Sequence, residues 1–364
     1  MKLYEIISVL ENFAPPAYQE SYDNSGLLVG DRNAEINSAL LCIDSTEDII
    51  DEAIENNISL VIAHHPIVFG GLKRFTGNNY VERTIIKAIK HNIAIYAAHT
   101  NLDSVQNGVN FKIAEKIGLQ NVKVLSPIEK NLRKLVTFVP KLHLEKVQNA
   151  VFEAGAGKIG NYDQCSFNLN GTGTFRGLTG ANPFVGQVGT LHFEEEVRLE
   201  TIFPKHLQSK ILTALLNAHP YEEVAYDIYS IENDNDSVGI GVVGNLPQAM
   251  EELEFLQNLK NIFEVKLLKH TPLLNKPIQK VALCGGSGSS LLKNAIRCGA
   301  DIFISADFKY HQFFDAENKL IIADIGHYES EQFTKEIFYE ILTKKFPNFA
   351  VQFSKKNTNP VCVL

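Results

Sequence analysis

Several features that mark common protein classes are missing from this 364-residue chain. Its five cysteines are scattered, odd in number and never spaced as CxxC, which argues against a disulfide framework and against a thiolate zinc knuckle. No uncharged apolar stretch approaches the ~20 residues that a membrane-spanning helix needs. We therefore expect buried or near-surface free thiols and no insertion into a membrane.

An excess of positive charge is missing as well. The formal net charge is −8 and no basic stripe runs along the chain, so we expect no binding to nucleic acid. The opening MKLYEIISVLENF carries acidic residues and no small-residue cleavage site, and it predicts a cytoplasmic protein. With 45% hydrophobic and 21% charged residues, the composition is that of a globular protein long enough for two domains.

What the chain does contain is a regular alternation of short apolar runs with helical patterns. In residues 1–130 the runs are SALLCID, SLVIAHH and NIAIYAAH, and after residue 234 they are KVALCGG, DIFISAD and KLIIADIGH. Segments of helical period separate them, as expected for βα units around a largely parallel sheet. The fold class predicted for residues 1–130 and 234–364 is therefore α/β.

Residues 131–233 follow a different pattern. A strand, a helix and a strand (LRKLVTFVP, HLEKVQNAVFEAGAG, QCSFNLNGTGTFR) are followed by a second such set (EVRLETIFP, HLQSKILTALLNA, AYDIYSIE). A βαβ unit written twice predicts a ferredoxin-like α+β domain with an antiparallel sheet and two helices on one face. We expect it as an insert in the α/β domain.

Three strand ends carry side chains that can bind metals. VIAHHPIVF ends a strand on His64 and His65, which we expect to diverge toward two neighbouring ions, although an isolated histidine pair is also common in loops. AAHTNLD places Asp103 after the next strand, where a turn or helix-cap role is the alternative. His99 falls inside that apolar run, and we interpret it as buried structure.

The sharpest local signal is DIGHYESE. His327 and Glu331, spaced i and i+4, share one face of a first helical turn, with a plain capping role as the alternative. A carboxylate can bridge two ions whereas an imidazole cannot. We predict two divalent ions, zinc, iron or manganese, one on His65, Asp103 and Glu331 and the other on His64, His327 and Glu331.

The motifs YDNSGLLVG, VIAHHPIVF, AHTNLD, CGGSGSS, SADFKYH and DIGHYESE, in this order, resemble the family of GTP cyclohydrolase I type 2 homologues, also called the NGG-interacting factor three (Nif-three-like) family. The resemblance implies one Nif-three-like domain around a metal crevice, with the same five ligand positions. It also implies a toroidal homohexamer and an insert similar to PII signalling and copper-tolerance proteins.

Two further motifs border the expected crevice. The glycines of CGGSGSSLL follow a strand and could cradle a phosphate, with a simple tight turn as the alternative. In SADFKYHQ, Asp307, Lys309 and His311 alternate at a strand end. His311 is a candidate proton shuttle, and an exposed strand end without a function is the alternative.

The predicted function is a metal-dependent hydrolase that acts on a phosphate ester or a C–N bond of a small molecule or nucleotide. The alternative is a non-catalytic metal-binding or regulatory protein. GTP cyclohydrolase activity is a minority hypothesis, because the well-characterised enzyme of that name holds its zinc partly by cysteine and the three ligand motifs contain none.

Overall fold

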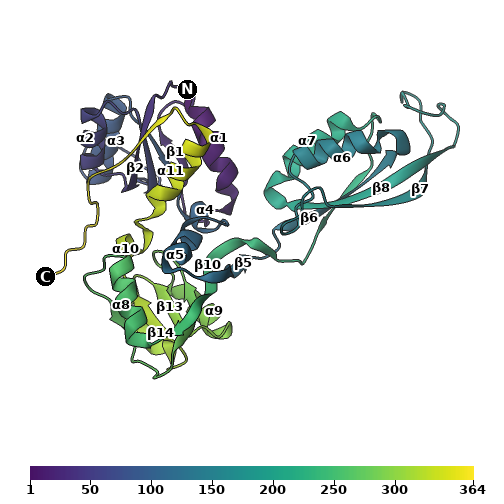
Figure 1. The fold of residues 1–364 in the computed structure, drawn as a ribbon. Coiled ribbons are helices and arrows are strands. Elements are labelled where there is room, and N and C mark those ends of the chain that lie inside the picture. Colours follow the sequence, from purple (N-terminus) through teal and green to yellow (C-terminus); the bar gives the residue numbers. More distant parts are fainter. The chain divides into compact units, whose positions relative to one another are not determined.

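The computed structural model describes residues 1–364 and divides into two compact units. Unit 1 combines residues 1–127 with 237–364, and unit 2 comprises residues 128–236 (Figure 1). No helix is long and apolar enough to cross a membrane.

Unit 1 contains a five-stranded sheet that is built mostly from the first third of the chain. Its order is β1 (Gly26–Val29), β4 (Ala94–Ala97), β3 (Leu60–His65), β2 (Ser38–Asp44) and β15 (Ala350–Phe353). All neighbours are parallel except β1 and β4. The predicted βα units are therefore present, and the last strand of the chain completes the sheet beside β2.

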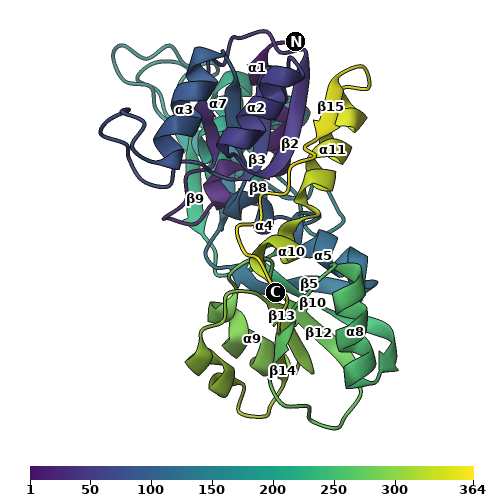
Figure 2. The ribbon, with the colours of Figure 1, turned by 90° about the vertical axis from the view of Figure 1, so that its left-hand side faces the viewer.

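Helices cover both faces of this sheet, as Figures 1 and 2 show. Apolar side chains of β2, β3 and β4 pack against one pair of helices, α2 (Glu47–Glu55) and α3 (Tyr80–Lys90). The opposite face is covered by α1 (Leu3–Phe13) and α11 (Thr334–Lys345). Strands buried on both faces read as continuous apolar runs, which is why SALLCID and SLVIAHH show no alternation.

A six-stranded sheet forms the rest of unit 1. Its order is β11 (Lys269–His270), β14 (Ile321–Asp324), β13 (Ile302–Ser305), β12 (Ile278–Leu283), β10 (Asn235–Met250) and β5 (Gln120–Ile128). The central strands β12, β13 and β14 are parallel, whereas β10 and β11 join antiparallel. Helices α8 (Glu252–Ile262) and α9 (Leu292–Arg297) belong to this half.

Short helical segments follow the strands that carry the predicted ligands. They are α4 (Thr100–Asp103) and α5 (Val109–Ile117) after β4, the 3₁₀ segment η5 (Tyr310–Ala316) after β13, and α10 (His327–Glu331) after β14. Because β3, β4 and β14 all present their carboxyl ends to this region, polar side chains from distant parts of the chain meet here.

Unit 2 has one four-stranded antiparallel sheet, in the order β7 (Ser166–Phe175), β8 (His192–Pro204), β6 (Leu132–Pro140) and β9 (Tyr226–Ser230). Helices α6 (Leu144–Glu153) and α7 (Gln208–Ala218) lie on one face of it (Figure 1). Between these helices and the sheet lies a hydrophobic core that includes Leu135, Val147 and Leu199. The other face of the sheet carries no helix.

Candidate metal centre

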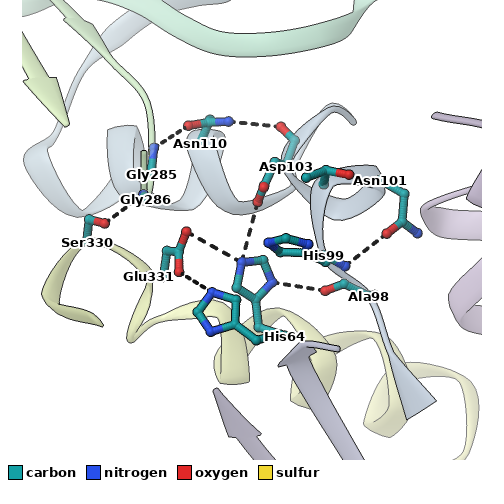
Figure 3. A network of polar contacts seen from close by, with 12 residues as sticks. His64, Ala98, His99, Asn101, Asp103, Asn110, Gly285, Gly286, Ser330 and Glu331 are labelled. Atoms are coloured by element: carbon teal, nitrogen blue, oxygen red, sulfur yellow. Dashed lines mark hydrogen bonds and ion pairs between the residues drawn. The ribbon is translucent and has the colours of Figure 1, made fainter. Parts of the chain in front are cut away.

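The five predicted ligands meet in unit 1, and we call His64, His65, Asp103, His327 and Glu331 the ligand cluster. His64 and His65 end β3, and their ring centroids lie 4.9 Å apart. Asp103 ends α4, while His327 and Glu331 begin and end the single turn of α10. Figure 3 shows Glu331 and Asp103 directed at His64 from two sides.

Glu331 is the central member of the ligand cluster. Its carboxylate is buried and its two oxygens have different neighbours. Oε1 lies 3.6 Å from His64 Nε2, and Oε2 lies 2.9 Å from His65 Nε2 and 3.2 Å from His327 Nε2. One oxygen directed at each of two imidazole groups is the arrangement that a bridging carboxylate requires.

The distances bring some side chains of the cluster closer together than others, while the predicted partition between two ions stays a prediction. His65 and His327 face one another with 3.3 Å between their Nε2 atoms, and with Glu331 they form one candidate metal-binding group. Asp103 Oδ1 instead lies 3.7 Å from His64 Nε2. The structure therefore pairs His65 with His327 and His64 with Asp103, because α10 places His327 beside His65 whereas α4 places Asp103 on the His64 side.

In each of the three histidines of the ligand cluster, Nδ1 lies within hydrogen-bond distance of an oxygen atom. His64 Nδ1 lies 2.9 Å from the Ala98 carbonyl oxygen, which can only accept, so Nδ1 donates to it and Nε2 faces the carboxylates of Asp103 and Glu331. Asp44 Oδ1 lies 2.7 Å from His65 Nδ1, and Asp307 Oδ2 lies 2.7 Å from His327 Nδ1. Oxygen partners on Nδ1 are typical of metal-binding histidines.

Two buried atoms of the ligand cluster, His64 Nε2 and Asp103 Oδ1, have no hydrogen-bond partner. Unsatisfied buried polar atoms are rare in folded proteins because each costs about 1–3 kcal/mol. Here the two atoms come from β3 and α4 and lie 3.7 Å apart, and Glu331 Oε1 of α10 lies 3.6 Å from His64 Nε2. Imidazole nitrogens and carboxylate oxygens are the donors that zinc, iron and manganese bind, so the residues fit a metal.

The charges in the cluster shift the pKa of several groups. Burial alone would lower the pKa of His65, but hydrogen bonds to Asp44 and Glu331 and the charges of these carboxylates raise it to about 10. The pKa of His327 rises against burial to about 9, mainly through Glu331 and then Asp307. Burial and the charge of Glu331 raise the pKa of Asp103 to about 7. The pKa of Glu331 is lowered, because His64, His327 and His65 outweigh its burial.

The expectation that His99 is buried inside a strand is wrong. Strand β4 ends at Ala97, and His99 sits at the start of α4 with its side chain in the cavity wall. Its Nδ1 lies 2.8 Å from Asp23 Oδ1, and its ring forms a second candidate metal-binding group with His64 and His65. The helix begins at Thr100 with His99 as an N-cap that makes no side-chain capping bond, so no capping signal in the sequence shows that the strand ends at Ala97.

The SADFKYH segment also differs from the predicted strand end. Strand β13 stops at Ser305, and Asp307 adopts a left-handed backbone conformation with φ +58° that turns the chain. Asp307 reaches His327, as described above. His311 lies in η5 with an exposed side chain, where its ring packs against Tyr310, and it does not line the cavity beside the ligand cluster.

The glycine-rich loop after β12 is held tightly by side chains of unit 1. The backbone N–H of Gly285 donates to Asn110, that of Gly286 to Ser330 and that of Gly288 to Ser305. Two of these contacts are drawn in Figure 3. These three N–H groups are therefore occupied by protein acceptors, which favours the tight-turn interpretation over a phosphate cradle.

A cavity of about 900 Å³ lies beside the ligand cluster. His65, Asp103, His327 and Glu331 line one part of its wall. Elsewhere the wall includes the buried thiol of Cys284, whose pKa is raised by burial, and the largely exposed rings Tyr22, Phe69 and Tyr80. This volume accommodates a small molecule in contact with the ligand cluster.

Taken together, the fold and the site define a mixed α/β protein with a cluster of histidine and acidic side chains that could bind a metal. The family model described as Duf34/NIF3 (NGG1p interacting factor 3) matches residues 1–360, and the chain belongs to this family. This confirms the resemblance inferred from the motifs.

Named relatives support the same assignment. A "GTP cyclohydrolase 1 type 2 homolog" of Bacillus subtilis is 41% identical over 367 residues, covering 99% of this chain and 98% of the relative. One from Halalkalibacterium halodurans is 40% identical over 360 residues, covering 98% and 97%. The crystal structure of a Bacillus cereus protein related to NIF3 matches with a TM-score of 0.88 at 38% identity, covering 100% of this chain and 99% of that one.

Proposed function

We propose that the ligand cluster binds two divalent metal ions and that the protein is a hydrolase of a phosphate ester or a C–N bond. The observation that carries this proposal is the orientation of Glu331, whose two oxygens are directed at separate imidazole groups beside an open cavity. When bound, the ions would supply Lewis-acid activation of water and of the substrate.

The protein's own residues would orient the ions and handle a proton. Asp44, the Ala98 carbonyl and Asp307 fix the three imidazoles through Nδ1, which keeps each Nε2 available. His99 is held through Nδ1 by Asp23 and lines the cavity, so its Nε2 is the group that we propose accepts or donates a proton. Tyr22 and Phe69 would limit access of bulk water to bound substrate.

The first test measures metal content. Purified protein is compared with Glu331→Ala and with the matched control Glu329→Ala, a neighbouring acid on α10 outside the ligand cluster. We expect two ions in the wild type and the control, and one or none in Glu331→Ala. Two ions retained in Glu331→Ala would reject the bridging role.

The second test addresses catalysis. Metal-loaded protein is screened against phosphoesters, nucleotides and amides, beside His99→Gln. Because His99 also belongs to a candidate metal-binding group with His64 and His65, the metal content of this variant is measured beside its turnover. With metal retained, we expect turnover to fall about 10²–10⁴-fold, the range expected for a general acid or base. Full metal content with no turnover in any substrate class would instead support a binding or regulatory protein.

We further propose that residues 1–130 and 234–364 form one metal-binding domain and that residues 131–233 are a ferredoxin-like insert similar to PII-like proteins. The βαββαβ element order of unit 2 and its sheet order β7, β8, β6, β9 support this. A toroidal homohexamer in the cytoplasm completes the proposal, and light scattering coupled to size-exclusion chromatography tests it with a six-fold multiple of the 40.6 kDa chain mass.

A further inference from the structure

The helix-free face of the unit 2 sheet contains a bare patch. On β7, Gly171 pairs with Glu196 of β8 and Gly173 pairs with Glu194, so these glycines and carboxylates share one face. Core residues such as Leu199, at odd positions of β8, point to the helices instead. Because glycine has no side chain, two glycines at alternate positions of β7 leave the backbone of this face uncovered there.

A cavity of about 640 Å³ occupies this patch. Its lining includes Gly171 and Gly173 of β7 and residues of the segment after β7, among them Leu178, Pro183 and Phe184. Phe175 and Phe184 stand beside Tyr221, with ring centroids 6.0 Å and 6.2 Å from it. The volume lies in the range of small-molecule sites, roughly 300–1,000 Å³, and the wall includes the aromatic rings of Phe138, Phe175, Phe184 and Tyr221.

A buried carboxylate lies in the wall of this cavity. Glu196 is only 9% exposed, and the Tyr221 hydroxyl donates to its Oε1 at 2.8 Å. A Cβ atom at Gly173 would lie 2.1 Å from Glu196 Oε2, so only glycine at this position leaves space for the carboxylate. The neighbouring Arg198 pairs with Glu200 rather than with Glu196, at 2.9 Å between Nε and Oε1.

The charge around the cavity is therefore unbalanced. Glu222 and Glu223 add two carboxylates to the wall, while the cationic side chains there are the paired Arg198 and the exposed Arg176. A buried carboxylate whose hydrogen-bond partner is a neutral phenol hydroxyl costs free energy, which a cation in the cavity would recover. Aromatic faces attract cations as well.

We propose that this cavity binds a small organic ammonium ion with an apolar body about the size of an aromatic ring. Glu196 is the counter-ion, and the rings of Phe175, Phe184 and Tyr221 hold the apolar body. The site lies wholly within unit 2 and shares no residue with the ligand cluster, so it is independent of the proposed hydrolase function.

Calorimetric titration of the full-length protein tests this proposal, with benzyltrimethylammonium as the probe. A quaternary ammonium has no lone pair and cannot ligate a metal, so binding at the ligand cluster is not confused with binding here. The comparators are 2-phenylethanol, which is neutral, and 3-phenylpropionate, which is anionic. We expect the cation to bind at least about tenfold more tightly than either comparator.

Three variants locate the site. Glu196→Gln should weaken binding of the cation about tenfold or more, whereas Glu195→Gln, an exposed neighbour that pairs with Thr172, removes the same charge and should change little. Gly171→Leu fills the cavity at a position where no atom lies within 4 Å of an added Cβ, and it should abolish binding. Circular dichroism and thermal unfolding verify that each variant is folded.

The opposite results overturn the proposal. They are the absence of saturable binding of benzyltrimethylammonium at millimolar concentration, equal affinity for the cation and the neutral comparator, or equal effects of Glu196→Gln and Glu195→Gln. Binding that survives in folded Gly171→Leu would place the cation elsewhere and would also reject this site.

Discussion

At the scale of single residues, the ligand cluster depends on side chains that do not themselves face a metal. His65 is the clearest case, because Asp44 binds its Nδ1 and is itself held by the hydroxyl of Thr358, 2.6 Å from Asp44 Oδ2. The pKa of Asp44 is lowered because His65 and Thr358 together outweigh its burial. A fixed, negatively charged partner makes the opposite ring nitrogen a better metal ligand.

Asp44→Asn should therefore weaken metal binding about 10–100-fold without removing any ligand. Competition with a chromophoric chelator measures the affinity. The matched control is Asp51→Asn, which removes a surface carboxylate paired with Lys87 and should leave the affinity unchanged. Equal affinities of Asp44→Asn and the control would show that Asp44 does not support His65.

Metal binding should also release protons. In the metal-free protein the pKa values of about 10 for His65 and about 9 for His327 keep both rings protonated at pH 7, but a ring must lose its Nε2 proton to bind a metal. Affinity should therefore rise as the pH is raised from 7 and level off above about pH 10. Titration calorimetry in buffers of different ionisation enthalpy measures the proton release, and its absence at pH 7 would contradict the assignment.

Not every residue of the site could be predicted from the sequence. His64, His65, His327 and Glu331 were found because strand ends and an i, i+4 spacing fix their positions locally. The partition of the ligands between two ions stays a prediction, because it depends on which side of the histidine pair α4 and α10 approach, and no local pattern encodes that approach. His99 was not predicted as a site residue because the apolar run NIAIYAAH continues beyond Ala97, where the pairing of β4 ends.

At the scale of elements, the backbone turn after β12 positions the Glu331 carboxylate. Gly286 has φ +56°, and an added Cβ would lie 2.3 Å from Glu331 Oε1. Its N–H also donates to Ser330, the residue before Glu331. This glycine-rich loop therefore serves the ligand cluster by leaving room for it, a role that the sequence pattern CGGSGSS did not distinguish from an ordinary turn.

Gly286→Ala should displace Glu331 and reduce metal content as well as stability. Gly299→Ala is the matched control, because Gly299 also has positive φ, at +71°, but nothing lies within 4 Å of an added Cβ. Both variants should lose about 1–2 kcal/mol from backbone strain, and only Gly286→Ala should lose metal. Denaturant unfolding measures the loss of stability and elemental analysis measures the loss of metal. Full metal content in Gly286→Ala would show that the loop can move enough to accommodate the added methyl group.

At the scale of the whole molecule, the ligand cluster joins segments that lie far apart in the chain. His64, His65 and Asp103 come from the five-stranded sheet and the helix after it, while His327 and Glu331 follow a strand of the six-stranded sheet. The class of fold was predictable because apolar strands alternate with helical patterns. The antiparallel strand β10, 16 residues long, was not predicted, because its glycines and polar residues interrupt any apolar run.

We expect the stability of unit 1 to depend on metal, because the proposed ligands come from both of its sheets. An ion that binds only the folded state stabilises it by RT ln(1 + [metal]/Kd), about 2.7 kcal/mol at a free concentration 100-fold above Kd. Unit 2 contributes no ligand, so its unfolding should not respond. Hydrogen exchange with and without a chelator resolves the two units along the chain. We expect chelation to speed hydrogen exchange in β3, α4 and α10 and to leave exchange in unit 2 unchanged. Equal acceleration in both units would mean that metal does not act through the ligand cluster.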